Sequence, residues 1–148
     1  MDRRTADWPN PERLSDMIKD IAVDDIVAVC GDARTIVIQP GEVLFREGDD
    51  ANAMYIVTRG TMRILSGSSI FETVHDGGIV GEMAIVEDNV PRSATVIAGT
   101  RCELIEIDVP QFLALVASVP AFSITVMRII ARRLRVMNRR HRETARRA

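Results

Sequence analysis

The sequence predicts a single domain that is mainly β, with helices on either side of the strands. Three observations support this prediction. The 148 residues suit one domain. Seven short runs rich in β-branched residues are separated by glycines or polar turns, and helical periodicity returns on both sides of them. Because no long helix fits between these runs, they favour an antiparallel barrel, roll or sandwich over a parallel sheet.

The first third of the chain predicts helices. Asn10 can cap a helix whose first residue is Pro11, and a row of apolar residues marks one face of that helix. The row consists of Leu14, Met17, Ile18 and Ile21. A second apolar stretch runs from Ile26 to Cys30 and stops at Gly31. We therefore assign residues 1–33 to an N-terminal helical segment.

Residues 34–108 hold the predicted strands. These are residues 35–39, 43–46, 53–58, 61–65, 70–75, 93–98 and 103–108. Alternating apolar and β-branched residues are typical of half-buried strands, and the glycines between the runs are typical of tight turns. Residues 80–95 include one stretch that interrupts the strand pattern.

Residues 109–148 predict two helices, Gln111–Val119 and Ala121–Arg142, with Pro120 as the start signal of the second. In the longer helix, apolar residues recur at alternating spacings of three and four. They are Met127, Ile130, Leu134 and Met137. Such a row fits packing on the β-domain or a homodimer seam, and too few heptads are present to decide.

The uncharged stretch 109–127 is about as long as a bilayer crossing. Prolines and polar residues interrupt it, and Pro120 divides it into two shorter helices. We therefore expect buried helices and no membrane segment in this chain.

Charge is unevenly distributed along the chain. Residues 128–148 contain nine arginines and the single acid Glu143, a net charge of +8, so residues 1–127 carry −10 within the total of −2. A basic tail on an acidic body suits an exposed arm or a tail that folds back on its own chain. Nucleic acid is the lesser alternative as partner, because no aromatic residue interleaves with the arginines.

Metal sites and catalysis find little support. Cys30 and Cys102 lie far apart without metal-ligand spacing, which fits a reducing compartment. Neither His75 nor His141 has a ligand partner at metal spacing, and Ser93 lacks a Gly-x-Ser-x-Gly elbow. The N-terminus has no apolar core of signal-peptide length. We expect a cytoplasmic binding protein with no metal and no enzymatic activity.

Residues 81–95 combine the features of an anion site with those of a hydroxyl acceptor. A short helix that opens at Gly81 would leave the N–H groups of Met83 and Ala84 for an anion. Arg92 can add a planar guanidinium and Ser93 a hydroxyl. Glu82 would repel a phosphate, but it suits a ligand that also donates a hydroxyl. A phosphate beside a ribose hydroxyl meets both demands.

These residues resemble a known family. GEMA at residues 81–84 and PRSAT at 91–95 look like the phosphate-binding cassette of the cyclic nucleotide-binding domain family. PGEVLFREGD at 40–49, with MYIV at 54–57 and RG at 59–60, is similar to the family's first strands. The match covers about residues 36–135. It implies a jelly-roll-like antiparallel β-roll with N-terminal helices, a short cassette helix and two C-terminal helices.

The resemblance also implies a function. The chain would be a regulatory or sensor module that signals through its C-terminal helix. Its ligand would be cAMP, with cGMP as the alternative, and it would need no cofactor. Because the sequence ends soon after this helix, we expect no helix-turn-helix domain of the kind found in catabolite-activator-like proteins. The runner-up function is nucleic-acid binding through the arginine-rich tail.

Residue roles follow from the same resemblance. The family residue at Glu82 holds the ribose 2′-hydroxyl, and the one at Arg92 pairs with the cyclic phosphate. A lid arginine thirteen residues after the proline that begins the last helix would be Arg133, with Arg132 as the neighbouring alternative. The remaining expected ligand-binding residues are Gly81, Met83, Ala84, Ser93, Ala94, Ile64 against the base, and Val80, where many members have an aromatic residue.

Overall fold

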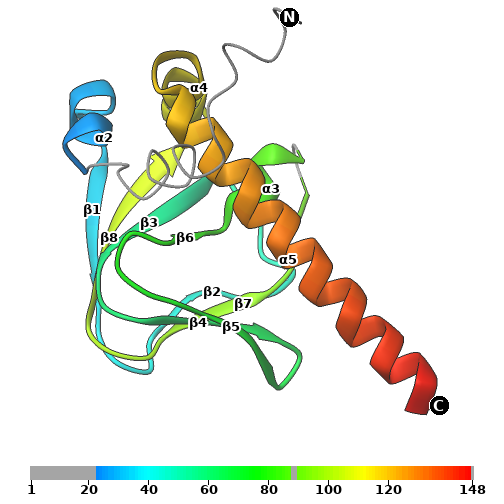
Figure 1. Ribbon diagram of the computed structural model, residues 1–148. Coiled ribbons are helices and arrows are strands. Elements are labelled where there is room, and N and C mark those ends of the chain that lie inside the picture. Colours follow the sequence, from blue (N-terminus) through cyan, green and yellow to red (C-terminus); the bar gives the residue numbers. More distant parts are fainter. Residues whose placement is uncertain (1–22, 88–89, 148) are drawn as a thin grey trace, which may run out of the picture.

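The computed structural model describes residues 23–87 and 90–147 (Figure 1). Its elements are α2 (Val23–Val29), β1 (Arg34–Ile38), β2 (Val43–Phe45), β3 (Ala53–Arg59), β4 (Met62–Ser66), β5 (Ser69–Val74), β6 (Ile79–Val80), α3 (Glu82–Val86), β7 (Thr95–Ala98), β8 (Cys102–Asp108), α4 (Val109–Ser118) and α5 (Pro120–Arg147). The helix expected at residues 10–21 lies outside the described residues.

The strands form two four-stranded sheets, in the orders β1-β8-β3-β6 and β2-β7-β4-β5. Every pairing is antiparallel. The sheets face one another and form the two walls of a roll (Figure 1). The predicted fold class, a mainly antiparallel β-roll with flanking helices, is therefore confirmed.

Strand β3 is buried on both faces because two separate cores meet there. Val57 points into the core between the sheets, where it joins Met62 of β4 and Leu104 of β8. Met54 and Ile56 point the other way, into a core shared with the helices. This alternation follows the two-residue period of a strand. The helices thus pack on the first sheet, and the second sheet is free to form the wall of a site.

A sharp bend joins the two C-terminal helices. Asp108 caps α4 by accepting a hydrogen bond from the Gln111 backbone N–H at 2.9 Å, and the Gln111 side chain accepts one from the Asp108 N–H in return. Helix α5 begins at Pro120 and leaves α4 at an angle of 115°. In the described ranges, only this bent pair taken together reaches the length and apolar character of a membrane crossing, and neither helix does alone.

Helix α5 has two parts. Phe122, Val126 and Ile129 in its first half are buried in the helical core. Its C-terminal end extends beyond the roll (Figure 1). The helix therefore crosses the end of the second sheet before it leaves the body of the protein, and this course makes it one side of the candidate site.

Candidate functional site

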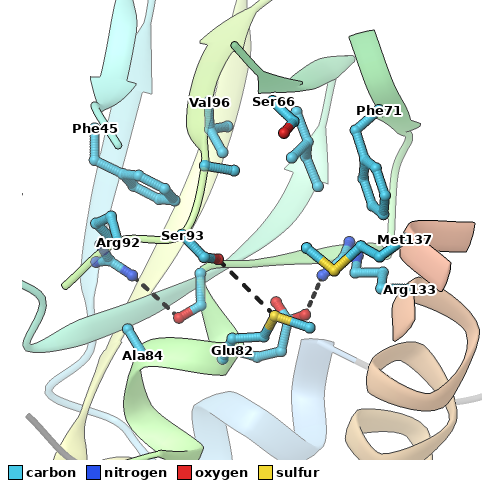
Figure 2. A pocket seen from close by; sticks show the side chains of 14 residues that line it. Phe45, Ser66, Phe71, Glu82, Ala84, Arg92, Ser93, Val96, Arg133 and Met137 are labelled. Atoms are coloured by element: carbon cyan, nitrogen blue, oxygen red, sulfur yellow. Dashed lines mark hydrogen bonds and ion pairs between the residues drawn. The ribbon is translucent and has the colours of Figure 1, made fainter. Parts of the chain in front are cut away.

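A cavity lies between the second sheet, α3 and α5, with an empty volume of about 530 Å³ including its mouth. Figure 2 shows Arg92 and Ser93 on one side of it, Phe71 and Met137 on the other, and Glu82 between them. The lining residues are Phe45, Ile64, Ser66, Phe71, Gly81, Glu82, Met83, Ala84, Arg92, Ser93, Ala94, Val96, Arg133 and Met137.

Gly81 joins β6 to α3 in a conformation that favours glycine. Its φ of 79° lies in the left-handed region, and a Cβ built on it would be 2.6 Å from Nη1 of Arg92. As the N-cap of α3, it provides no side chain to the first N–H groups of the helix. The glycine thus lets the backbone turn sharply while the arginine passes close to it.

Arg92 is 5% exposed and its guanidinium lies against the backbone of the cassette. Nη1 donates to the Gly81 carbonyl at 3.1 Å and Nη2 to the Ala53 carbonyl at 2.6 Å. Its Cζ lies 4.0 Å from the centroid of the Phe45 ring, a cation–π contact. Burial lowers the pKa of this guanidinium, and the nearby Tyr55 opposes the shift.

One donor of Arg92 stays unsatisfied. Nε is buried and finds no hydrogen-bond partner in the described part of the chain. Buried polar groups in native proteins nearly always have a partner, so this orphaned donor beside the cavity is a group that a bound anion could satisfy. Because Nε is itself buried, the side chain must turn before an anion in the cavity can reach it.

Glu82 is 1% exposed and forms a buried ion pair with Nη1 of Arg133. Arg133, 5% exposed, also donates through Nε to Glu72 at 2.7 Å and through Nη2 to the Ile79 carbonyl at 2.7 Å. A buried charge is tolerated when it is paired and hydrogen-bonded, and both partners here meet this condition. Arg133 thus ties α5 to α3, β5 and β6 at once.

Most residues that the sequence singled out line this one cavity. They are Gly81, Glu82, Met83, Ala84, Arg92, Ser93, Ala94, Ile64 and Arg133. Residues 64 and 133 come from elements far from the cassette in sequence, and the fold brings them to it. Which of these residues contacts a ligand remains a prediction, since the structure holds none.

Two expected residues do not reach the cavity wall. Val80 is fully buried in the core between the sheets, because its position on β6 opposite Tyr55 directs the side chain inward. Arg132 is exposed on α5 and approaches Glu72 only to 3.8 Å. Successive residues of a helix point about 100° apart, so Arg132 and Arg133 cannot share the same place. The helix register places Arg133 at the cavity, and the lid role of either arginine stays a prediction.

The apolar row of the last helix does not lie on one surface. Ile130 packs against the helical core, and Met137 lines the cavity. Met127 and Leu134 are 60% and 47% exposed. Two members of the row therefore pack inside the protein, and the other two are exposed on the surface of α5.

Several lining residues were missed from the sequence. Phe45, Ser66, Phe71, Val96 and Met137 all line the cavity. Met137 lies four residues after Arg133, on the same face of the helix, so the lid assignment already contained the signal for it. The strand residues carry no local mark, because their side chains meet only when the second sheet closes over the cassette.

The cavity has chemically distinct ends. Arg92, Ser93 and Glu82 offer donors for an anion and an acceptor for a hydroxyl, whereas Ile64, Phe71 and Met137 form an apolar end. A ligand that matches these ends has an anionic group, a hydroxyl and a flat apolar ring, in that order. A nucleotide has this arrangement.

Comparisons with known proteins agree. The model of the cyclic nucleotide-binding domain matches residues 35–119. The cAMP-dependent protein kinase regulatory subunit of Schizosaccharomyces pombe is 35% identical over 80 residues, which are 53% of this chain and 19% of that protein. The cAMP-activated global transcriptional regulator CRP of Salmonella typhimurium is 30% identical over 98 residues, 63% of this chain and 47% of that protein. The chain thus spans between a fifth and a half of these relatives.

Solved structures share the fold. The catabolite activator protein of Thermus thermophilus has a TM-score of 0.70 at 22% identity, over 87% of this chain and 62% of that one. The structure described as "Sp-2Cl-cAMPS bound to PKAR CBD2" has a TM-score of 0.70 at 24% identity, over 85% of each chain. Because the family model covers more than half of the sequence, this chain belongs to the cyclic nucleotide-binding domain family.

Proposed function

We propose that this chain is a non-enzymatic sensor that binds a cyclic purine nucleotide in the cavity and signals through α5. One observation carries the proposal. The buried guanidinium of Arg92, with its unsatisfied Nε, and the buried carboxylate of Glu82 line the same cavity. A phosphate joined to a ribose offers an anion to the guanidinium and a hydroxyl donor to the carboxylate, so it suits both groups.

The proposed roles follow the two ends of the cavity. Arg92 and Ser93 hold the cyclic phosphate, and Glu82 accepts the ribose 2′-hydroxyl. Ile64, Phe71 and Met137 pack against the base. The family resemblance and the relatives named for cAMP favour that nucleotide, and cGMP is the alternative. We place the protein in the cytoplasm, because the buried free thiols of Cys30 and Cys102 suit a reducing compartment.

Signalling through α5 is supported by the contacts of Arg133. Its partner Glu82 is also the proposed acceptor for the ribose, so a bound nucleotide would change the link between α3 and α5. Hydrogen exchange across residues 129–136 should slow on binding if the ligand orders this segment. Protection confined to residues 81–94 would instead identify a static binder.

Thermal unfolding tests the proposal directly. A ligand that binds only the folded state, at about 100 times its Kd, stabilises it by about 2.7 kcal/mol. We expect cAMP or cGMP to raise Tm, AMP to do so far less, and a short duplex DNA to have no effect. If both cyclic nucleotides leave Tm unchanged at millimolar concentration, the proposal fails.

A second candidate, nucleic-acid binding, is favoured by a row of exposed arginines along one face of α5. Their spacing alternates between four and three residues: Arg128, Arg132, Arg135, Arg139, Arg142 and Arg146. Such a row could neutralise phosphates. Binding would then weaken with salt, with a slope of log K against log salt of about −0.9 for each neutralised phosphate. A salt-dependent complex with duplex DNA would support it, and its absence at low salt would exclude it.

We also propose a homodimer whose seam is reduced to the exposed pair Met127 and Leu134, seven residues apart on α5. A seven-residue repeat is the period of a coiled-coil seam. Ile130 and Met137, which face inward, would not take part.

A further inference from the structure

Three residues on one face of α5 run along the cavity from its middle to its apolar end. Arg133, Met137 and Arg140 are spaced by four and three residues, so their side chains lie one above the other. Arg133 binds Glu82, the proposed ribose acceptor, and Met137 lines the apolar end. Arg140 is the next residue on this face, beyond the place where the base would lie.

The apolar end of the cavity adjoins a groove on the protein surface. This groove shares Ser66, Phe71 and Met137 with the cavity. Its other lining residues are all polar: Ser69, Asn138, Arg140 and His141. A base that packs on Phe71 and Met137 would therefore turn its outer edge toward hydrogen-bonding groups and not toward an apolar wall.

Arg140 is held next to the Phe71 ring. Its Nη2 donates to the Ile70 carbonyl at 2.7 Å, and its Cζ lies 5.2 Å from the centroid of the Phe71 ring. A cation–π contact and a hydrogen bond thus fix the guanidinium beside the ring that bounds the base end. To bind a base, the Arg140 guanidinium would replace some of its present hydrogen bonds with hydrogen bonds to the base. The aliphatic part of its side chain would stay in place.

The donor pattern of an arginine selects among purines. A guanidinium only donates hydrogen bonds. Guanine presents two adjacent acceptors, O6 and N7, which match the arginine fork, whereas adenine places the N6 donor beside N7. We infer that Arg140 reads the outer edge of the bound base and that the site prefers cGMP to cAMP. This inference rests on the proposed function and decides against the cAMP that the family resemblance favours.

Asn138 is the competing reader. An asparagine amide matches the N6 and N7 of adenine, and Asn138 also lines the groove. It lies one residue after Met137, about 100° around the helix, and its side chain is exposed. Arg140, in contrast, lies on the cavity face of α5 and contacts Phe71. The placement of the two residues favours the arginine.

Competition binding to the full chain tests the inference with four ligands: cGMP, cAMP, cyclic IMP and 7-deaza-cGMP. We expect cGMP to bind at least about fivefold more tightly than cAMP, as one bidentate pair provides. Cyclic IMP, which keeps O6 and N7, should bind like cGMP. The 7-deaza analogue lacks N7 and should lose most of the preference. These comparisons use only the unmodified chain, so a folding defect in a variant cannot affect the result.

Variants then identify the residue that contacts the edge of the base. Arg140→Lys should bring cGMP to the level of cAMP and leave cAMP affinity nearly unchanged, because the charge remains and the fork is lost. Arg139→Lys, at the exposed neighbouring position, should keep the preference. The inference is overturned by equal affinities or a cAMP preference in the unmodified chain, by a preference that survives Arg140→Lys, or by one that only Asn138→Ala removes. If neither cyclic nucleotide binds, the proposed function fails as well.

Discussion

Arg133 of α5 and Glu82 of α3 form a buried ion pair across 51 positions of the chain. The carboxylate that the resemblance assigns to the ribose is therefore also one of the groups that hold α5 in place. Whatever binds this carboxylate changes the free energy of the helix contact, and by linkage the position of the helix changes ligand affinity by the same factor. In the proposed function, this ion pair couples the nucleotide site to α5 without a long pathway.

The phosphate role of Arg92 is tested by Arg92→Ala. We expect binding of a cyclic nucleotide to weaken by about 2–5 kcal/mol, the usual cost of truncating one partner of a desolvated charge pair. The fold also loses stability, because the Gly81 and Ala53 carbonyls lose their donor. Arg92→Lys keeps the charge and serves as the control in isothermal titration. Unchanged affinity in a folded Arg92→Ala variant would contradict the phosphate assignment.

The ribose role of Glu82 is tested with paired ligands. Glu82→Ala should weaken cAMP and cGMP binding less than Arg92→Ala does, and it should not weaken the binding of 2′-deoxy analogues, which lack the hydroxyl. Glu72 still pairs with Arg133, so we expect the variant to fold. Equal losses for ribose and deoxyribose ligands in competition binding would show that Glu82 acts only through α5.

Because Arg92 passes close to Gly81, a side chain at this position should weaken nucleotide binding as well as strain the backbone. Gly81→Ala and Gly77→Ala should each cost about 1–2 kcal/mol of unfolding free energy, because both glycines have φ near 80°. A Cβ at position 77 meets nothing within 4 Å, whereas at 81 it collides with Arg92. Only Gly81→Ala should therefore weaken nucleotide binding. Denaturant unfolding and titration of both variants separate strain from displacement, and equal affinities would contradict the argument.

The docked helix predicts a kinetic effect of Arg133→Lys. A lysine cannot reproduce the three hydrogen bonds of this guanidinium, so α5 should dock less firmly. If the helix closes after the phosphate has bound, the dissociation rate rises and the association rate stays near that of the unmodified chain. Arg132→Lys, on the exposed side of α5, is the matched control. Stopped-flow dissociation of a fluorescent cyclic nucleotide checks both, and the same off-rate for all three proteins would remove the arginine lid.

The proposed homodimer predicts a concentration-dependent mass that Leu134→Glu abolishes. Leu134 is exposed in the single chain, and the proposed dimer would bury it in the seam. A glutamate at this position would then be a buried, unpaired charge, which the dimer cannot tolerate. Leu113→Glu on α4 is the control, because Leu113 is also exposed, at 59% against 47% for Leu134, and lies on another helix. Sedimentation velocity distinguishes the two. A monomer at all concentrations, or a dimer that both variants keep, would contradict the seam.

The strands could be predicted because their signal is local. Six of the seven predicted runs agree with β1 to β5 and β8 to within about a residue at each end, since alternation and glycine turns are read from neighbouring positions. The run at 93–98 starts later, at Thr95, because residues 91–94 belong to the cassette loop. Strand β6 was missed, because two residues between glycines are too short to show any period.

The sequence alone determined the class of the fold and the contents of the cassette, because residues 81–95 adjoin in the chain and their chemistry can be read together. Only the tertiary structure decided which arginine of α5 meets Glu82, and that the same arginine also binds Glu72. It also decided that Met137 faces the cavity while Leu134 faces solvent. The last two lie three residues apart in one apolar row. A helical period states which residues share a face, but burial depends on what packs against that face, and contacts between distant segments set this.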